Sequence, residues 1–125
     1  MSQKNKKQFG IWMDTKHATI VGRVGEEATD FIVMGHVKNE VSVANSSEKN
    51  EHNEERTLQQ KFFKEILSNM QNADEVHITG TGTSQEQLMH FMADSPQYKN
   101  TKTAESTSNK MSDERLLEYI AGKFG

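Results

Sequence analysis

The sequence predicts a mixed α/β fold in which three antiparallel strands precede alternating helices and strands. Two observations support this class. Apolar residues alternate with a period of two in the N-terminal third of the chain, as they do in half-buried strands. Further along, helical spacing of apolar residues alternates with short strand patterns. The chain has 125 residues, the length of one domain, and is long enough to bury its own core.

The N-terminal pattern predicts a meander. Residues 9–13 alternate apolar positions, residues 14–17 are polar and suit a tight turn, and residues 18–24 resume the alternation. A third strand is marked by Phe31, Val33 and Val37. Residues 1–8 are polar and rich in lysine, so we expect a flexible arm before a single domain over residues 9–125.

The segment 38–56 is mostly Asn, Ser, Glu and Lys, and its only large apolar residues are Val41 and Val43. This composition cannot offset the entropy lost on ordering, so we expect a mobile loop. Five glutamates against two lysines and one arginine give the segment a net charge of −2. RNA phosphates would repel it, and we expect it to contact a protein partner rather than RNA.

The second half of the chain predicts three helices and two strands. The first helix begins at the capping-box spacing 57–60, a strand covers 75–79, and the second helix begins near Ser84. A polar, lysine-bearing edge strand covers 98–104. The last helix begins at Ser112, where Met111 and Leu116 have the spacing of a hydrophobic staple. The apolar face of the first helix comprises Leu58, Phe62, Phe63, Ile66, Leu67 and Met70.

The predicted order is therefore β-β-β-α-β-α-β-α, with a mixed sheet and helices packed on it. This order is that of the ribonuclease H-like architecture. A net charge of −3 argues against a surface that binds nucleic acid all over. There are no cysteines and no long apolar runs, so we expect a cytoplasmic protein without a disulfide scaffold or a membrane span.

The turn 80–84 is the first candidate site, because a strand runs through Gly-Thr-Gly directly into a helix. Neither the P-loop lysine nor the third glycine of a dinucleotide-binding loop is present. A general anion site at the helix N-terminus remains, formed by Gly80, Thr81, Gly82, Thr83 and Ser84. The alternative, which we favour, is structural: the glycines permit the bend, and Thr83 or Ser84 caps the helix.

The hairpin turn is the second candidate site, with Asp14, Lys16 and His17. In a ribonuclease H-like nuclease, an acid at this strand end helps to hold two metal ions, and Glu65 could join it from the first helix. Asp74, however, precedes its strand instead of following it. We therefore favour a turn-forming role for Asp14 and expect no bound metal or cofactor.

Other polar residues suggest weaker sites. The five histidines lack metal-ligand spacing, although His36 and His77 would approach one another if their strands were neighbours. Trp12 is expected to pack in the core. Lysines could form a small RNA-facing patch or simply a solubilising edge; they are Lys4, Lys6, Lys7, Lys99, Lys102 and Lys110.

Two stretches resemble the middle domain of archaeo-eukaryotic class-1 release factors and of their relative Pelota. They are the hairpin GIWMDTKHATIVG, residues 10–22, and the strand–turn–helix segment HITGTGTSQEQLMHFM, residues 77–92. Asp14 and Ala18 match the family's hairpin, and Gly80 and Gly82 its Gly-Pro-Gly turn, with Thr81 in place of proline. The long polar loop also stands where the release factors carry Gly-Gly-Gln, the motif that promotes peptidyl-tRNA hydrolysis, but this sequence has no Gly-Gly-Gln.

The resemblance implies a ribonuclease H-like fold and a role in translation or ribosome rescue without peptide-release chemistry. The leading hypothesis is a non-catalytic binding module whose partners are the ribosome or translation factors. Two alternatives stay open: a metal-dependent nuclease or hydrolase, and a stand-alone protein-interaction domain.

Overall fold

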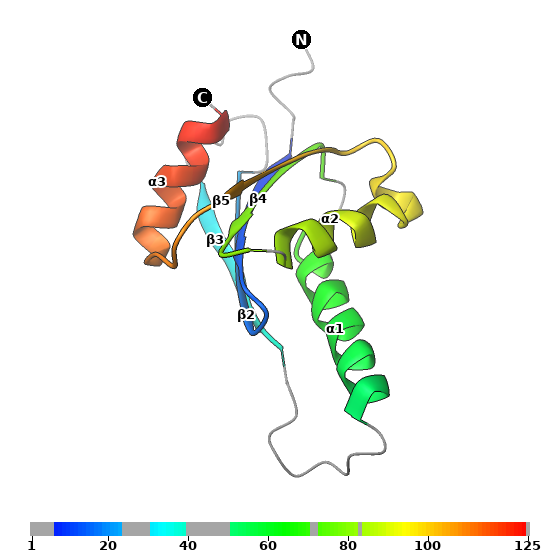
Figure 1. Ribbon diagram of the computed structural model, residues 1–125. Helices are drawn as coiled ribbons and strands as arrows, with labels where there is room; N and C mark the ends of the chain where they lie inside the picture. The colour runs from blue at the N-terminus through cyan, green and yellow to red at the C-terminus, as the bar shows by residue number, and fades with distance from the viewer. Residues whose placement is uncertain (1–6, 24–30, 40–50, 71–72, 83, 125) are drawn as a thin grey trace.

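The computed structural model describes residues 7–23, 31–39, 51–70, 73–82 and 84–124, with the backbone alone for residues 51–56. These residues form a central sheet with helices on both of its faces (Figure 1). Within these ranges, no helix is both long and apolar enough to cross a membrane.

The sheet formed by the described residues has five strands in the order β3-β2-β1-β4-β5. Its strands are β1 (Gln8–Met13), β2 (His17–Arg23), β3 (Ile32–Lys38), β4 (Glu75–Gly80) and β5 (Lys102–Thr107). β1, β2 and β3 pair antiparallel, whereas β4 pairs parallel with both β1 and β5. The sheet is therefore mixed, as the sequence predicts.

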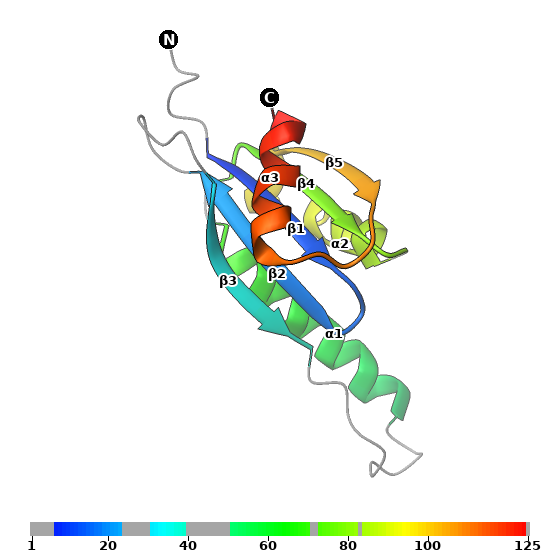
Figure 2. The same cartoon turned by 90° about the vertical axis from the view of Figure 1, so that its left-hand side faces the viewer.

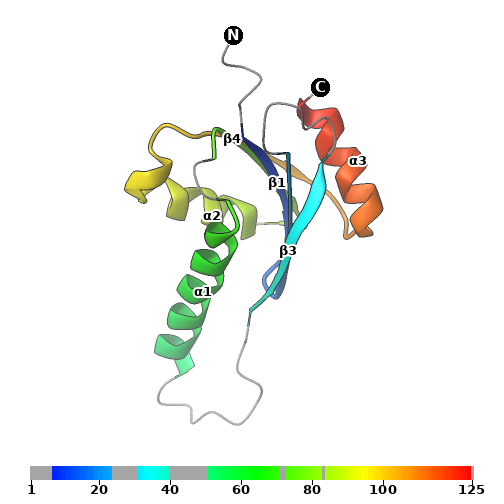
Figure 3. The ribbon, with the colours of Figure 1, turned by 180° about the vertical axis from the view of Figure 1, so that it is seen from behind.

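Helices cover both faces of this sheet. α1 (Glu51–Ser68) and α2 (Ser84–Ala93) lie on one face, and α3 (Asp113–Phe124) lies on the other (Figures 1 and 3). A short 3₁₀ helix, η3 (Pro96–Tyr98), connects α2 to β5. Apart from η3, the element order is the predicted one; the mixed α/β class is confirmed and is consistent with a ribonuclease H-like fold.

The larger core lies between the sheet and helices α1 and α2. Alternate residues of the central strands point into it, such as Ile11 on β1 and Ile78 on β4, which are both fully buried. The apolar face predicted for the first helix supplies the opposite side: Phe62, Phe63, Ile66, Leu67 and Met70 are all buried. The apolar face of the strands, which alternates with a period of two, thus packs against the apolar face of α1, which follows helical spacing.

A second core lies between the sheet and α3. Trp12 is 4% exposed and packs there with Leu116 and Ile120, which confirms its predicted packing role. The backbone of β1 approaches α3 very closely, because a β-carbon added to Gly10 would lie 2.4 Å from Cγ1 of Ile120. Only glycine leaves room for the helix at this position.

The first helix begins earlier than the sequence suggests. α1 starts at Glu51, so the predicted start at Thr57 is wrong, and residues 51–56 belong to the helix instead of to the loop. The rest of the predicted loop, residues 40–50, lies outside the described residues, as does most of the N-terminal arm.

The edge strand begins later than the prediction of residues 98–104. Tyr98 ends η3 and is buried, and its hydroxyl donates to the carbonyl oxygens of Leu67 at 2.8 Å and Met70 at 3.1 Å. Leu67 is in the last turn of α1, where its carbonyl also accepts the N–H of Met70 at 2.9 Å, and Met70 follows the helix. Tyr98 therefore bonds to the end of α1 and the residue after it instead of belonging to the edge strand, and β5 starts only at Lys102.

Candidate functional site

Helix α3 covers only part of its side of the sheet. It contacts β1, β2 and β3, while β5 and part of β4 lie beside it (Figure 2). The strands that α3 leaves uncovered carry polar side chains on this face: His77 and Thr79 on β4, and Ser106 on β5. Polar residues at this position need partners, and they find them in one another and in α3.

Five side chains from β4, β5, the segment after β5, and α3 form one hydrogen-bonded network. The Ser106 hydroxyl is its centre, 2.8 Å from Nε2 of His77, 3.0 Å from Oγ1 of Thr79 and 2.8 Å from the Tyr119 hydroxyl. Thr79 Oγ1 also lies 2.7 Å from the hydroxyl of Ser108. We call these five residues the hydroxyl cluster.

The hydroxyl cluster is closed on one side and open on the other. Thr79 is fully buried and His77 is 8% exposed, so these two residues form the inner wall. Ser106, Ser108 and Tyr119 are half-buried and face the surface. Buried hydrogen-bonded residues thus hold the orientation of the partly exposed hydroxyls.

Burial and the nearby charge of Lys123 lower the pKa of His77 below its ordinary value of 6.5, so the ring is neutral at neutral pH. Burial alone would raise the pKa of Tyr119 above 10.0. Hydrogen bonding with Ser106 and Thr79 and the charge of Lys123 outweigh burial, and the pKa of this phenol is lowered. The cluster is therefore an environment that favours negative charge and disfavours positive charge.

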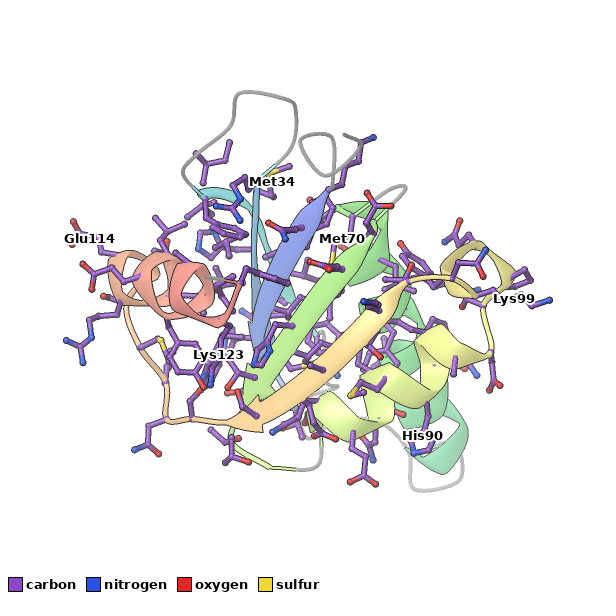
Figure 4. The ribbon with its side chains drawn as sticks, turned by 90° about the horizontal axis from the view of Figure 1, so that it is seen from above. Met34, Met70, His90, Lys99, Glu114 and Lys123 are labelled. Atoms are coloured by element: carbon purple, nitrogen blue, oxygen red, sulfur yellow. The ribbon has the colours of Figure 1, made fainter. Side chains whose placement is uncertain are left out.

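Tyr119 connects the hydroxyl cluster to a basic stripe on α3. Arg115, Tyr119 and Lys123 are spaced four residues apart and share one side of the helix. Lys123 Nζ lies 5.1 Å from the centroid of the Tyr119 ring. In Figure 4, Lys123 lies on the side of α3 that faces the strands, whereas Glu114 points outward. We call these three residues the α3 stripe.

A surface hollow of about 480 Å³ adjoins the α3 stripe. It is lined by Asn109, Lys110, Met111, Arg115, Glu118 and Tyr119. The indole Nε1 of Trp12 donates to the carbonyl oxygen of Asn109 at 3.1 Å. This bond fixes one wall of the hollow to the buried strand β1.

The predicted glycine turn lies at the carboxyl end of β4. Gln85 is 1% exposed, and its amide donates to the carbonyl oxygens of Gly80 at 3.3 Å and Ser106 at 3.1 Å. Its Oε1 accepts from the Gly82 N–H at 3.3 Å. An anion at this turn would have to compete with Gln85 for that N–H group. Anion binding here stays a prediction.

The two glycines of this turn differ in how much room there is for a side chain. A β-carbon at Gly80 would lie 2.1 Å from the carbonyl oxygen of Met13, whereas the space around Gly82 is open. Gly80 is thus required by the close approach of β1. Of the two proposed caps, Ser84 is buried and Thr83 lies outside the described residues; Thr81 is exposed.

The predicted hairpin site lies at the same end of the sheet as the glycine turn, at the carboxyl end of β1. The Asp14 carboxylate accepts the backbone N–H groups of Lys16 at 2.8 Å and His17 at 2.6 Å. This is the favoured turn-forming role. Asp14 follows β1 and the glycine turn follows the adjacent parallel strand β4, so the fold places the two predicted sites side by side. A binding role for Lys16 or His17 stays a prediction.

The carboxylates considered for a metal site do not converge. Asp74 accepts the N–H of Lys7 at the amino end of β4, and Asp14 lies at the carboxyl end of β1. These strands are parallel neighbours, so the two acids lie at opposite ends of the sheet. In the part of the chain that the structure describes, no three His, Cys, Asp or Glu residues are grouped to hold a metal ion.

The histidine and lysine expectations need correction. His36 and His77 do not approach, because β2 and β1 separate β3 from β4. His36 instead lies 3.0 Å from the Asp113 carboxylate. Lys102 begins β5 and Lys110 follows its far end, so they do not form one patch. Lys4 and Lys6 lie outside the described residues.

The hydroxyl cluster was not predicted from the sequence. Its signals are the polar alternations His77-x-Thr79 and Ser106-x-Ser108, together with the helical spacing of the α3 stripe. Each is weak alone, since alternating polar residues also mark the solvent side of any edge strand. Only the pairing of Thr79 with Ser106 across β4 and β5 joins them.

No protein-family model and no curated protein sequence matches the chain. Solved structures do match. Pelota of Thermoplasma acidophilum superposes with a TM-score of 0.64 at 16% identity, over 94% of this chain and 33% of that protein. Pelota of Archaeoglobus fulgidus gives 0.58 at 9% identity, over 98% and 36% of the two chains. The archaeal translation termination factor aRF1 gives 0.60 at 14% identity, over 97% and 35%.

The chain thus spans about a third of the length of these proteins, and it shares one domain-sized unit with each. Identities this low establish the fold alone. The fold of this chain is that of the Pelota and aRF1 middle domain.

Proposed function

We propose that the chain is a non-catalytic binding module that acts with the translation machinery in the cytoplasm. The observation that carries this proposal is the likeness of nearly the whole chain to domains of Pelota and of a translation termination factor. Three matches agree on the same class of protein, although their sequences differ widely from this one.

The non-catalytic part of the proposal rests on the residues. The sequence has no Gly-Gly-Gln, so the peptide-release chemistry that the resemblance would bring is not expected. Asp14 is engaged in its turn, Asp74 lies at the other end of the sheet, and Glu65 is exposed on α1. A two-metal nuclease needs carboxylates that converge on two metal ions about 4 Å apart.

Sucrose-gradient fractionation of tagged protein from its own host, during growth and under stress, tests the proposal. We expect the protein in ribosomal or ribosomal-subunit fractions. Gly80→Val, which should misfold because its side chain would collide with Met13, is the control for retention by the tag alone. Wild-type protein confined to ribosome-free fractions in every condition would contradict the proposal.

A further inference from the structure

We propose that the hydroxyl cluster and the α3 stripe bind backbone phosphates of a single-stranded RNA. This inference deepens the proposed function, on which its biological context rests, by naming a contact surface and the chemistry it takes. The surface comprises Ser106, Ser108 and Tyr119, with Arg115 and Lys123 on α3 and Lys110 at the adjoining hollow.

Local charge favours an anion. Lys110 and Arg115 line the hollow together with Tyr119, Lys123 lies over the Tyr119 ring, and Glu118 is the one acid among the residues that line the hollow. Within the described residues, none of these three cations forms an ion pair with a carboxylate. The chain as a whole carries a net charge of −3, so this is a local reversal of sign. Uncompensated cations attract phosphate.

Ser108 lies at the outer end of the hydrogen-bond network. Ser106 donates its only proton to Thr79, so the neutral His77 ring and the Tyr119 phenol must both donate to Ser106. Thr79 and Ser108 lie 2.7 Å apart, and either hydroxyl can be the donor. Ser108 is half-exposed, so its hydroxyl can also turn to donate to a phosphate oxygen at the surface.

The dimensions suit a strand with more than one phosphate. Arg115 and Lys123 are eight residues apart on α3, which corresponds to about 12 Å along a helix axis. Each can thus meet a different phosphate of an extended strand, with Tyr119 and the cluster between them. The neutral state of His77 keeps the inner wall uncharged, so the charge that holds the ligand comes from the exposed cations.

Fluorescence anisotropy with a labelled single-stranded RNA of about twelve nucleotides tests the proposal with purified, full-length protein. We expect the double variant Arg115→Gln with Lys123→Gln to bind about tenfold more weakly at low salt. The slope of log affinity against log salt should also fall by about 1.4, since two phosphate contacts are lost. The matched control, Lys64→Gln with Lys99→Gln, removes equal charge outside this surface and should change neither value.

The hydroxyl contribution has its own pair of variants. Ser108→Ala should weaken RNA binding several-fold, whereas Thr103→Ala, an exposed hydroxyl on the other face of β5, should not. Circular dichroism and thermal melts of all variants show whether a loss of binding reflects unfolding. Since these side chains are exposed or half-exposed, we expect the variants to fold.

Several results would overturn the inference. They are an absence of RNA binding, equal losses in the double variant and its control, and equally tight binding of a poly-glutamate peptide of matched charge. Binding of inorganic phosphate by calorimetry, without RNA binding, would assign the site to a small phosphate ligand and reject RNA. If the double variant still enters ribosomal fractions with wild-type recovery, the inference fails while the proposed function stands. If wild-type protein binds RNA as expected but never enters those fractions, the proposed function fails instead.

Discussion

The hydroxyl oxygen of Tyr119 lies 2.8 Å from that of Ser106, and this contact joins α3 to the edge strand β5. α3 otherwise packs on β1, β2 and β3, so the contact extends its attachment toward the far edge of the sheet. We expect Tyr119→Phe to lower the free energy of unfolding by about 1 kcal/mol. In a double-mutant cycle with Ser106→Ala, measured by urea unfolding, the coupling energy should exceed about 0.5 kcal/mol. Strict additivity would show that the contact contributes nothing to stability.

The buried His77 predicts a specific pH dependence. Its folded-state pKa lies below the ordinary value of 6.5. Above that value the imidazole is neutral in both states; as the pH falls below it, the unfolded chain takes up a proton that the folded chain resists. Stability is therefore lost on acidification, and His77→Gln should lose less between pH 7.5 and about 5.5 than wild type. Urea unfolding at several pH values measures this. His90→Gln, whose side chain is 79% exposed, is the matched exposed-histidine control.

The glycines of β1 and α3 predict opposite effects of one substitution. Gly10→Ala places a β-carbon against the Ile120 side chain and should destabilise the fold by about 1–3 kcal/mol. Gly122→Ala meets open space on α3 and should stabilise the helix by up to about 1 kcal/mol. Thermal melts of both variants measure these two changes in stability. A Gly10→Ala protein as stable as wild type would mean that α3 does not pack closely on β1.

The hydrogen bonds of Gln85 predict that this side chain stabilises the glycine turn. Gln85→Ala removes a buried amide that bonds the Gly82 N–H and the carbonyl oxygens of Gly80 and Ser106, which should cost about 1–3 kcal/mol. Gln87→Ala removes an exposed amide that bonds to the exposed side of α1 at Gln59 and should cost little. Equal stability of the two variants, in urea unfolding, would show that the turn does not depend on Gln85.

The sequence predicted the order of the elements because their signals are local. The N-terminal hairpin, the strand 75–79 and the last helix were recognisable from alternation, turn residues and capping. Ser112 indeed accepts the N–H of Arg115 at 3.2 Å, and Met111 and Leu116 share the α3 core. The predicted starts of α1 and β5 were wrong because the local sequence pattern did not show the longer helix or the tertiary contact that sets each boundary. The capping-box spacing at Thr57 lies inside α1, which begins at Glu51. Tyr98, predicted to begin the edge strand, instead donates its hydroxyl hydrogen to Leu67 of α1.

The hydroxyl cluster could not be predicted in the same way because it depends on contacts between distant segments. His77 and Ser106 are 29 residues apart, and Ser106 and Tyr119 are 13 apart. Their meeting depends on the parallel register of β4 with β5 and on the position of α3, neither of which a local pattern encodes. For the same reason the sequence left open whether His36 and His77 lie on neighbouring strands, and the strand order shows that they do not.

The central claim, that the chain binds the translation machinery, is tested most directly by affinity capture of the tagged protein from its host's lysate. Ribosomal proteins in the eluate are quantified with and without prior ribonuclease treatment. We expect enrichment of ribosomal proteins over an unrelated tagged protein of similar size, lost after ribonuclease treatment and reduced in the double variant Arg115→Gln with Lys123→Gln. Recovery of ribosomal proteins at the level of the unrelated control, in growth and under stress, would contradict it.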